Sequence, residues 1–317
     1  MQRRQFFFLG AAFLAACSRN SKPCADCSPG APVNEAPGVV LRASWGQEPG
    51  QLGVSDPEEA NPEAPMSLAV DPETGEVLLL DQVNQRVQVF AGSSLKHTIA
   101  LPSGNAQDLA LLPNGNIVVA DRLVQGELIE LDREGSIQNR TALVGDGIEF
   151  PAELTALFSN EEGIWGELGS RSIWLLDSTG TAPVQREILP GYPQGSRLYK
   201  AQGTGKTLSI TSAPRNEATG QKQTTLQYQS AVTSITTLRV DAQGKIYVAT
   251  RHLVDDGKSS SESCWMVVLG TDLKEERRFE LKPRDGAREI FRDVEIAQTG
   301  AIYQLQITAD GASVERY

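Results

Sequence analysis

Short apolar segments recur along residues 38–317, and each is followed by a polar turn that contains a glycine and then by a second apolar segment. The clearest copies of this unit run through residues 67–90 and 108–131. No long window with the 3.6-residue period of an amphipathic helix lies among them. The pattern predicts an all-β chain built from repeated antiparallel sheets.

The turn glycines repeat at the length of a propeller blade. They are Gly75, Gly115, Gly163, Gly205, Gly244 and Gly300, at spacings of 40, 48, 42, 39 and 56 residues. Repeats of this length are typical of four-stranded blades. We therefore expect a six-bladed β-propeller of four-stranded antiparallel blades, in preference to five or seven blades. Nearly continuous apolar runs, such as residues 77–80 and 246–249, agree with this fold, because stacked blades bury both faces of each sheet.

The two ends of the repeated region fit a ring that is closed by its first strand. Residues 289–317 provide three strands for the last blade, whereas the apolar segment 39–45 stands ahead of the first repeat without a partner. We expect this segment to become the outer strand of the last blade, with Leu41 beside Val314, because closure removes an exposed sheet edge. The fourth blade, expected over residues 197–233, is the weakest, since little chain remains for its last strand.

Blade one carries a set of residues that resembles a known repeat. The set comprises Pro65, residues 67–71, Gly75, Asp81, Asn84 and residues 86–90, preceded by residues 50–53. It is similar to the pattern of the NHL-repeat family, whose members are propellers. Blade two keeps Asp121 without the following Asn and Arg, and the later blades keep mainly the turn glycine and the apolar strands. The resemblance implies the propeller fold for residues 38–317 and transfers hardly any functional residue.

Residues 1–16 have the pattern of an export signal. Two arginines precede an apolar run over residues 6–16, which is shorter than the roughly 20 residues that a helix needs to span a bilayer. The segment 14–17, Leu-Ala-Ala-Cys, resembles the lipobox of bacterial lipoproteins, which implies cleavage before Cys17 and acylation of its thiol, as with palmitate. The chain is then anchored to a lipid bilayer through Cys17. An ordinary signal peptide ending at the same place is the alternative.

The residues around this cysteine refine the expected location. Ser18 follows Cys17, which in Gram-negative lipoproteins implies the outer membrane, here facing the periplasm. Arg3 and Arg4 also begin a partial twin-arginine motif, so twin-arginine export and general secretory export both stay open. Residues 17–37 are rich in Pro, Ser, Ala and Asn, and we expect them to form a flexible tether ahead of the propeller.

Charge and cysteine content narrow the classes of partner. Lys and Arg number 29 against 40 Asp and Glu, a net charge of -11, and this acidic balance excludes nucleic acid as the expected partner. Cys24 and Cys27 form a C-x-x-C motif inside the tether with Ser28 after it, which argues against covalent haem and leaves a local disulfide or two unpaired thiols. With only His97 and His252 in the chain, a His-rich metal centre is excluded.

In a propeller, the turn between strands two and three and the lead-in to strand one open at the same end of the central channel. We expect a ligand-binding mouth there, lined by acids and arginines that suit a peptide, a glycan or a cation. The candidate lining residues are Asp81, Asp121, Glu167, Arg197, Arg251, His252 and Arg292. Asp81 and Asp121 also fit a purely structural role, capping turns at strand ends. The loops 212–223 and 251–263 are expected side by side above this mouth.

Asp108, Glu153 and Asp293 are the candidate metal ligands. Their carboxylates suit a hard divalent cation such as calcium, and they resemble the oxygen ligands of gluconolactonase-like six-bladed propellers. The sequence contains no nucleophile elbow, phosphate-binding loop or H-E-x-x-H motif, so we expect no catalytic residue. The expected function is a binding or scaffolding module for an envelope protein, peptide or glycan, or an assembly factor of an envelope complex. The alternative is a divalent-cation-dependent hydrolase.

Overall fold

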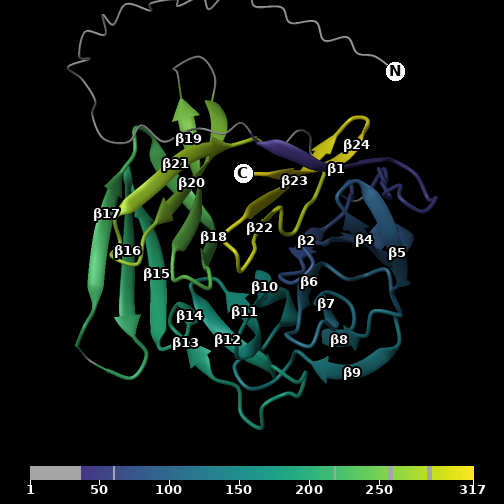
Figure 1. Cartoon of the computed structure of the whole chain (residues 1–317), viewed down its shortest axis with the longest axis horizontal. Coiled ribbons are helices and arrows are strands. Elements are labelled where there is room, and N and C mark those ends of the chain that lie inside the picture. Colours follow the sequence, from purple (N-terminus) through teal and green to yellow (C-terminus); the bar gives the residue numbers. More distant parts are fainter. Residues whose placement is uncertain (1–36, 60, 218, 256–259, 284–287) are drawn as a thin grey trace, which may run out of the picture. The chain divides into compact units, whose positions relative to one another are not determined.

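Six four-stranded antiparallel sheets are arranged as the blades of a propeller (Figure 1). The computed structural model describes residues 37–59, 61–217, 219–255, 260–283 and 288–317. Within these ranges the helical elements are two short 3₁₀ turns, η1 Gln82–Asn84 and η2 Pro151–Glu153, and no helix could span a membrane. The six-bladed, all-β fold expected from the glycine spacing is confirmed. The predicted signal sequence, and the tether up to residue 36, lie outside the described residues.

The blades follow one another along the chain. Blade one contains β2 Ser67–Val70, β3 Val77–Asp81, β4 Arg86–Ala91 and β5 Ser94–Ala100. Blade two contains β6 Asp108–Leu111, β7 Ile117–Asp121, β8 Glu127–Leu131 and β9 Ile137–Ala142. Blade three contains β10 Ala156–Asn160, β11 Gly163–Leu168, β12 Arg171–Asp177 and β13 Ile188–Leu189. Blade four contains β14 Tyr192–Gln194, β15 Arg197–Thr204, β16 Thr207–Pro214 and β17 Lys222–Gln227. Blade five contains β18 Ala231–Val240, β19 Ile246–Asp255, β20 Ser260–Leu269 and β21 Glu275–Leu281.

Blade six combines both ends of the described chain. Its strands are β22 Val294–Ile296, β23 Ile302–Thr308, β24 Gly311–Arg316 and β1 Gly38–Ser44, in that order (Figure 1). Leu41 lies opposite Val314 in the antiparallel pair of β1 and β24, and both side chains are fully buried. The predicted closure by the first strand is therefore confirmed. Its physical basis is that β24 would otherwise present an unpaired edge.

The core lies between the blades. All five residues of β3 and all five of β7 are buried, which requires a covered surface on each face of the sheet. Between blades six and one, for example, Leu305 and Val314 share one cluster with Leu68 and Leu79. The continuous apolar runs of the sequence thus correspond to strands that are packed on both faces by neighbouring sheets.

The ring has two different ends. In every blade the innermost strand begins at the same end of the ring, which we call the leading end. The turn between strands two and three also lies at this end. The turns between strands one and two, and between strands three and four, lie at the trailing end. Strands β16 and β17 of blade four meet at the trailing end, between Pro214 and Lys222, whereas strands β19 and β20 of blade five meet at the leading end. The described residues that flank the two predicted loops therefore lie at opposite ends, so the expectation that the loops sit side by side is wrong.

Blade four also begins earlier than its sequence suggested. Gly205 lies between β15 and β16, the second and third strands, and Gly195 occupies the turn between the first two strands. The innermost strand β14 has only three residues and contains Pro193, so it carries no apolar run that a pattern search would detect. Because the blade starts at Tyr192, enough chain remains for the six-residue outer strand β17. The expected start at Arg197 and the expected shortage of chain are both wrong.

Candidate ligand-binding channel

A layer of charged side chains crosses the central channel. Its five members come from four blades and are Asp108, Glu167, Arg239, Arg292 and Glu295. Arg292 Nε lies 3.0 Å from Asp108 Oδ1, and Arg292 Nη1 forms an ion pair with Glu295 Oε2. Arg239 forms a second ion pair, with Glu167. The ring closure brings these groups together although Asp108 and Arg292 are 184 residues apart in the sequence.

Asp108 is held in the interior by backbone and side-chain donors. The side chain is fully buried, and its carboxylate accepts hydrogen bonds from the backbone N–H groups of Leu109 at 2.9 Å and Leu157 at 2.6 Å. Arg292 supplies the opposite charge and donates from Nη2 to the carbonyl of Leu109 at 2.7 Å. A buried carboxylate requires this kind of compensation. Asp108 therefore joins blades two, three and six.

The layer carries fixed charges next to a protonated tyrosine. Desolvation alone would lower the pKa of Arg292, but the nearby Asp108 and Glu295 outweigh it and raise that pKa. Burial raises the pKa of Glu295, against the opposing effects of Arg292 and Arg239. Burial also raises the pKa of Tyr192, whose ring lies 5.5 Å from the Arg239 guanidinium carbon. Both arginines are therefore cationic at neutral pH and Tyr192 is a neutral hydrogen-bonding group.

The charged layer lies between two cavities of the channel. The cavity at the leading end has a volume of about 860 Å³ and is lined by Glu167, among others, whereas the cavity at the trailing end has about 910 Å³ and is lined by Glu295 and Arg239. Arg292 and Tyr192 line both. Each cavity is large enough for part of a peptide or a short glycan.

The leading-end cavity contains part of the predicted mouth. Glu167, Arg251 and Arg292 line it, as does the predicted metal ligand Asp293. Arg251 also contacts Glu262 at 3.4 Å across the β19–β20 hairpin. These four residues come from blades three, five and six. They meet because, in each blade, the second strand ends at the same end of the ring at which the first strand begins.

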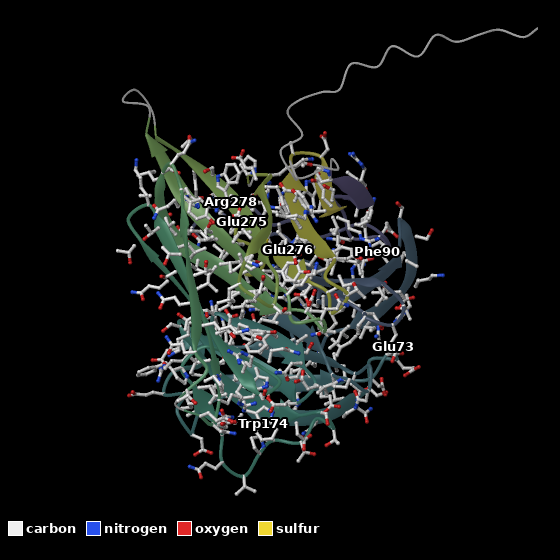
Figure 2. All side chains as sticks on the ribbon, turned by 60° about the vertical axis from the view of Figure 1, so that its left-hand side comes forward. Glu73, Phe90, Trp174, Glu275, Glu276 and Arg278 are labelled. Carbon is white, nitrogen blue, oxygen red and sulfur yellow. The ribbon has the colours of Figure 1, made fainter. Side chains whose placement is uncertain are left out.

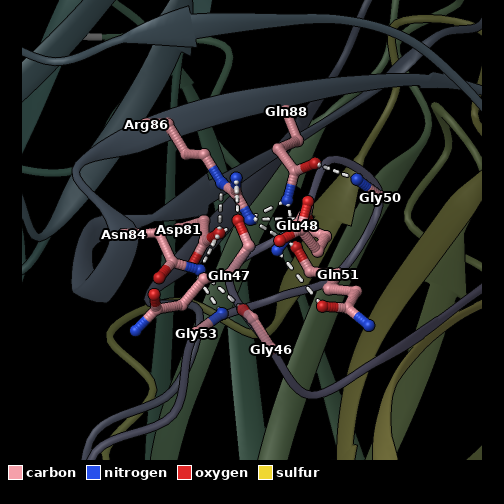
Figure 3. Close-up of polar contacts among 10 residues, drawn as sticks. All are labelled: Gly46, Gln47, Glu48, Gly50, Gln51, Gly53, Asp81, Asn84, Arg86 and Gln88. Carbon is pink, nitrogen blue, oxygen red and sulfur yellow. Dashed lines mark hydrogen bonds and ion pairs between the residues drawn. The ribbon is translucent and has the colours of Figure 1, made fainter.

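Asp81 instead belongs to a buried network at the junction between β1 and blade one (Figure 3). Its carboxylate accepts from Arg86 Nε at 2.8 Å, from Asn84 Nδ2 at 2.9 Å and from the Gly53 N–H at 2.8 Å. Arg86 also donates to backbone carbonyls of the loop that follows β1, for example to Gln51 O at 2.7 Å. The residues that resemble the NHL pattern therefore fix the loop that follows the ring-closing strand.

Asp121 has a comparable structural role in blade two. It is fully buried and accepts from the backbone N–H groups of Val124 at 3.0 Å and Gln125 at 3.1 Å. These bonds cap the turn between β7 and β8. Asp121 therefore takes the turn-capping role that was considered as the alternative to ligand binding. Asp81 is structural in a different way, because its side chain makes no capping bond to η1 and instead binds Arg86, Asn84 and the Gly53 N–H. Neither aspartate lines the cavity.

His252 is buried inside blade five instead of lining the mouth. Its Nε2 lies 2.8 Å from Thr250 Oγ1, and its ring lies 4.4 Å from the ring of Tyr228. Figure 2 shows Arg278 on blade five beside Glu275, and its guanidinium carbon lies 4.4 Å from the centroid of the Tyr228 ring. Desolvation lowers the pKa of His252, the Ser230 carbonyl opposes this, and Arg278 adds to it. His252 is therefore a neutral core residue at pH 7.

Two further predicted residues lie away from the mouth. Arg197 begins β15 at the trailing end, where it donates to Ser212 Oγ at 2.7 Å and lines the other cavity. The error follows from placing Arg197 in the first strand of blade four. Glu153 is exposed in η2. Among the described residues no group of three or more His, Cys, Asp or Glu side chains is placed to hold a metal ion, so Asp108, Glu153 and Asp293 do not form the expected cluster.

Several residues that line the two cavities were not predicted from the sequence. Arg171 begins β12 and Lys200 lies in β15; both are exposed and line the leading-end cavity. Arg239 and Glu295 were also missed, although a charged residue within an innermost, buried strand is a detectable signal. Lys200 was hidden by the wrong start of blade four.

The leading-end cavity is basic although the chain is acidic. Four basic residues line it, Arg171, Lys200, Arg251 and Arg292, against the acidic Glu167 and Asp293. Glu167 is already paired with Arg239. Within the described part of the chain, Arg171 and Lys200 form no ion pair with a carboxylate. Five serine and threonine side chains also line the cavity, together with two tyrosines and several apolar side chains. The hydroxyl residues are Thr155, Ser170, Ser172, Thr236 and Thr237.

No protein-family model matches the chain, and no curated protein matches it in sequence. Solved structures resemble it in fold. Hydrazine synthase from Kuenenia stuttgartiensis superposes with a TM-score of 0.50 at 11% identity, over 78% of this chain and 76% of that chain. A gluconolactonase from Xanthomonas campestris superposes with a TM-score of 0.42 at 12% identity, over 79% of this chain and 84% of that chain. Virginiamycin B lyase from Staphylococcus aureus superposes with a TM-score of 0.44 at 10% identity, over 84% of this chain and 98% of that chain. At identities this low, the likeness is one of fold alone.

Proposed function

We propose that this protein is a binding module of the bacterial envelope and that its leading-end cavity holds a carboxylate group of a peptide or glycan. The observation that carries the proposal is the basic lining of this cavity in a chain with a net charge of -11. Arg171 and Lys200 are available to a ligand, while Arg292 and Glu167 are engaged in the charged layer.

The chemistry of the lining favours a carboxylate. A guanidinium presents a planar pair of donors that matches a carboxylate, and a lysine adds a mobile point charge. The five hydroxyl side chains suit the amide or hydroxyl groups of the rest of the ligand. Glu167 and Asp293 in the same wall disfavour a ligand with a higher negative charge, such as a phosphate dianion. A carboxylate with neutral polar neighbours is therefore the best match.

Binding is a better match than hydrolysis. The hydrolase alternative needs carboxylates grouped around a cation, whereas Asp108 is committed to Arg292 and two backbone N–H groups. No observation among the described residues favours the hydrolase.

The proposal is tested by calorimetric titration of the full chain carrying Cys17→Ser, kept in detergent because this variant retains the apolar residues 6–16. The probes are a tetrapeptide with a free carboxylate and its amide, and a glucuronic-acid disaccharide and its neutral counterpart. We expect the charged form of one pair to bind at least tenfold more tightly than its neutral form. Arg171→Gln and Lys200→Gln should each weaken that binding about tenfold, the loss of one charge-assisted hydrogen bond.

Lys206→Gln is the matched control, because Lys206 is an exposed lysine of the same blade and the same end that does not line the cavity. It should change the affinity less than twofold. Equal binding of the charged and neutral probes, or an equal effect of Lys206→Gln and Lys200→Gln, would show that the cavity is not a carboxylate site. The two probe pairs separate a peptide from a glycan ligand.

We further propose that Cys17 is acylated and anchors the propeller to the outer membrane, facing the periplasm, and that blade one is an NHL-type repeat. The lipobox-like residues 14–17 and Ser18 support the anchor, and the Asp81–Arg86 network supports the repeat. Growth with tritiated palmitate should label the wild-type protein and leave Cys17→Ser unlabelled. Labelling of the Cys17→Ser protein, or none of the wild type, would contradict the anchor.

Replacement of Arg3 and Arg4 by lysine should block export only if the twin-arginine route is used.

A further inference from the structure

A second surface at the leading end consists of exposed apolar side chains, none of which lines the cavity. Leu123, Val124, Val144 and Phe150 are each between 57% and 61% exposed. We call these four residues the apolar patch. Leu123 and Val124 lie in the turn between β7 and β8, and Val144 and Phe150 lie in the connection from blade two to blade three. Exposed apolar groups that gather on one surface mark an interaction site, whereas single ones do not.

The two loops of the patch are held against each other. The Leu143 N–H donates to the Gly126 carbonyl at 2.7 Å, and Arg122 donates to the Leu154 carbonyl at 3.0 Å. The hairpin that carries Val144 is closed by a pair of bonds between Gly145 and Ile148, at 2.9 and 3.1 Å. The apolar side chains are therefore presented on a fixed backbone, and a partner would meet a surface that is already formed.

The charges around the patch select the kind of partner. Asp146, Glu149 and Glu153 are exposed in the same connection between blades. The nearby Arg122 and Arg186 keep their positive charges, but both are half-buried and donate to backbone carbonyls, Arg186 to Gly145 O at 2.9 Å. The exposed charges of this connection are the three carboxylates. The rim of the patch is therefore acidic, so an anionic lipid surface and a second copy of this chain both meet like charge. A segment with both apolar and basic side chains complements it.

The patch also continues toward the cavity. The Arg122 guanidinium lies over the Phe291 ring at 4.5 Å, and Phe291 lines the leading-end cavity. A protein bound at the patch would thus lie at the rim of the channel mouth. We infer that the apolar patch is a docking surface for a protein segment with apolar and basic side chains. This inference does not depend on what the cavity binds.

The test uses three synthetic 16-residue peptides, composed of Leu and Lys, of Leu and Glu, and of Ser and Lys, titrated by fluorescence anisotropy into the same Cys17→Ser chain. We expect the Leu/Lys peptide to bind at least tenfold more tightly than the other two. The double variant Leu123→Ser, Phe150→Ser should weaken its binding at least tenfold. The matched control is Ile137→Ser, Val184→Ser, which removes two other exposed apolar side chains and should change the affinity less than twofold.

A second variant keeps the test independent of folding. Glu149→Lys, Glu153→Lys leaves every apolar side chain in place and should weaken the Leu/Lys peptide while strengthening the Leu/Glu peptide. Equal affinity of wild type and both variants would overturn the inference, as would Leu/Glu binding as tight as Leu/Lys binding. Flotation with phosphatidylglycerol vesicles that requires Leu123 and Phe150 would assign the patch to a membrane instead. Lys200→Gln should leave the peptide affinity unchanged, which separates this surface from the cavity.

Discussion

Arg86 Nε lies 2.8 Å from Asp81 Oδ2, and Asp81 is completely shielded from solvent. The remaining donors of Arg86 reach the carbonyls of Gln47 at 2.8 Å and Gln51 at 2.7 Å (Figure 3). The loop that contains these carbonyls leads from the ring-closing strand β1 into blade one. One ion pair therefore connects the closure of blade six to the start of the ring.

Asp81→Asn should lower the free energy of unfolding by about 3–5 kcal/mol, because it leaves the buried Arg86 without its counter-ion. Urea unfolding followed by tryptophan fluorescence measures the change. Asp272→Asn is the control, since it breaks an ion pair with Lys274 in which both side chains are more than half exposed. That variant should lose much less stability than Asp81→Asn, because solvent screens an exposed ion pair. Similar losses in the two variants would show that the Asp81 network does not stabilise the closure.

Leu41→Ala should destabilise the protein by about 2–5 kcal/mol, the range for a large apolar side chain removed from a packed core. Leu41 is fully buried against Val314 and Leu305 in the interface between blades six and one. Val39→Ala, in the same strand at a 39% exposed position, should have an effect of about 0.5 kcal/mol or less. Thermal unfolding of the three proteins compares them directly. An effect of Val39→Ala as large as that of Leu41→Ala would mean that β1 does not close the ring in solution.

His252 should make the protein less stable as the pH falls below 6.5, the ordinary pKa of a histidine side chain. Its folded pKa is lowered by desolvation, so the unfolded state binds a proton first and gains stability relative to the folded state. The stabilising contribution is complete above pH 6.5 and is lost toward the lower, folded pKa. His252→Gln should therefore lose less stability than wild type between pH 7.5 and pH 5.5 in urea titrations. Proton NMR of the two histidines, assigned with His97→Gln, should place the His252 pKa below 6.5. A higher value would contradict the burial argument.

Glu295 should show the opposite dependence, since burial raises its pKa above the ordinary 4.5. The folded state then holds the proton more tightly than the unfolded state, and this contribution to stability is largest at acidic pH. It declines as the pH rises through the folded pKa. Glu295→Gln should therefore gain stability relative to wild type as the pH rises from about 4.5 toward 7. A difference that shrinks over this range would show that Arg292 and Arg239 outweigh desolvation.

The sequence predicted most of the fold and part of the channel mouth. Glu167, Arg251, Arg292 and Asp293 meet at one cavity, as expected from their places near the ends of second strands and the starts of first strands. Arg197 was misplaced because the three-residue strand β14 has no apolar run, and Lys200 was overlooked for the same reason. Whether an acid at a strand end faces the channel or caps a turn, as Asp121 does, depends on nearby backbone N–H groups that no spacing rule describes.

The number of blades and the strand that closes them were set by the sequence itself, since glycine spacing and continuous apolar runs are local properties of the chain. The partners within the charged layer were decided only by the tertiary structure. Asp108 and Arg292 are 184 residues apart, and their attraction exists only after the ring has closed and removed both from water. The same holds for the two loops of the apolar patch, because only the folded chain brings residues 122–126 against the connection from blade two to blade three.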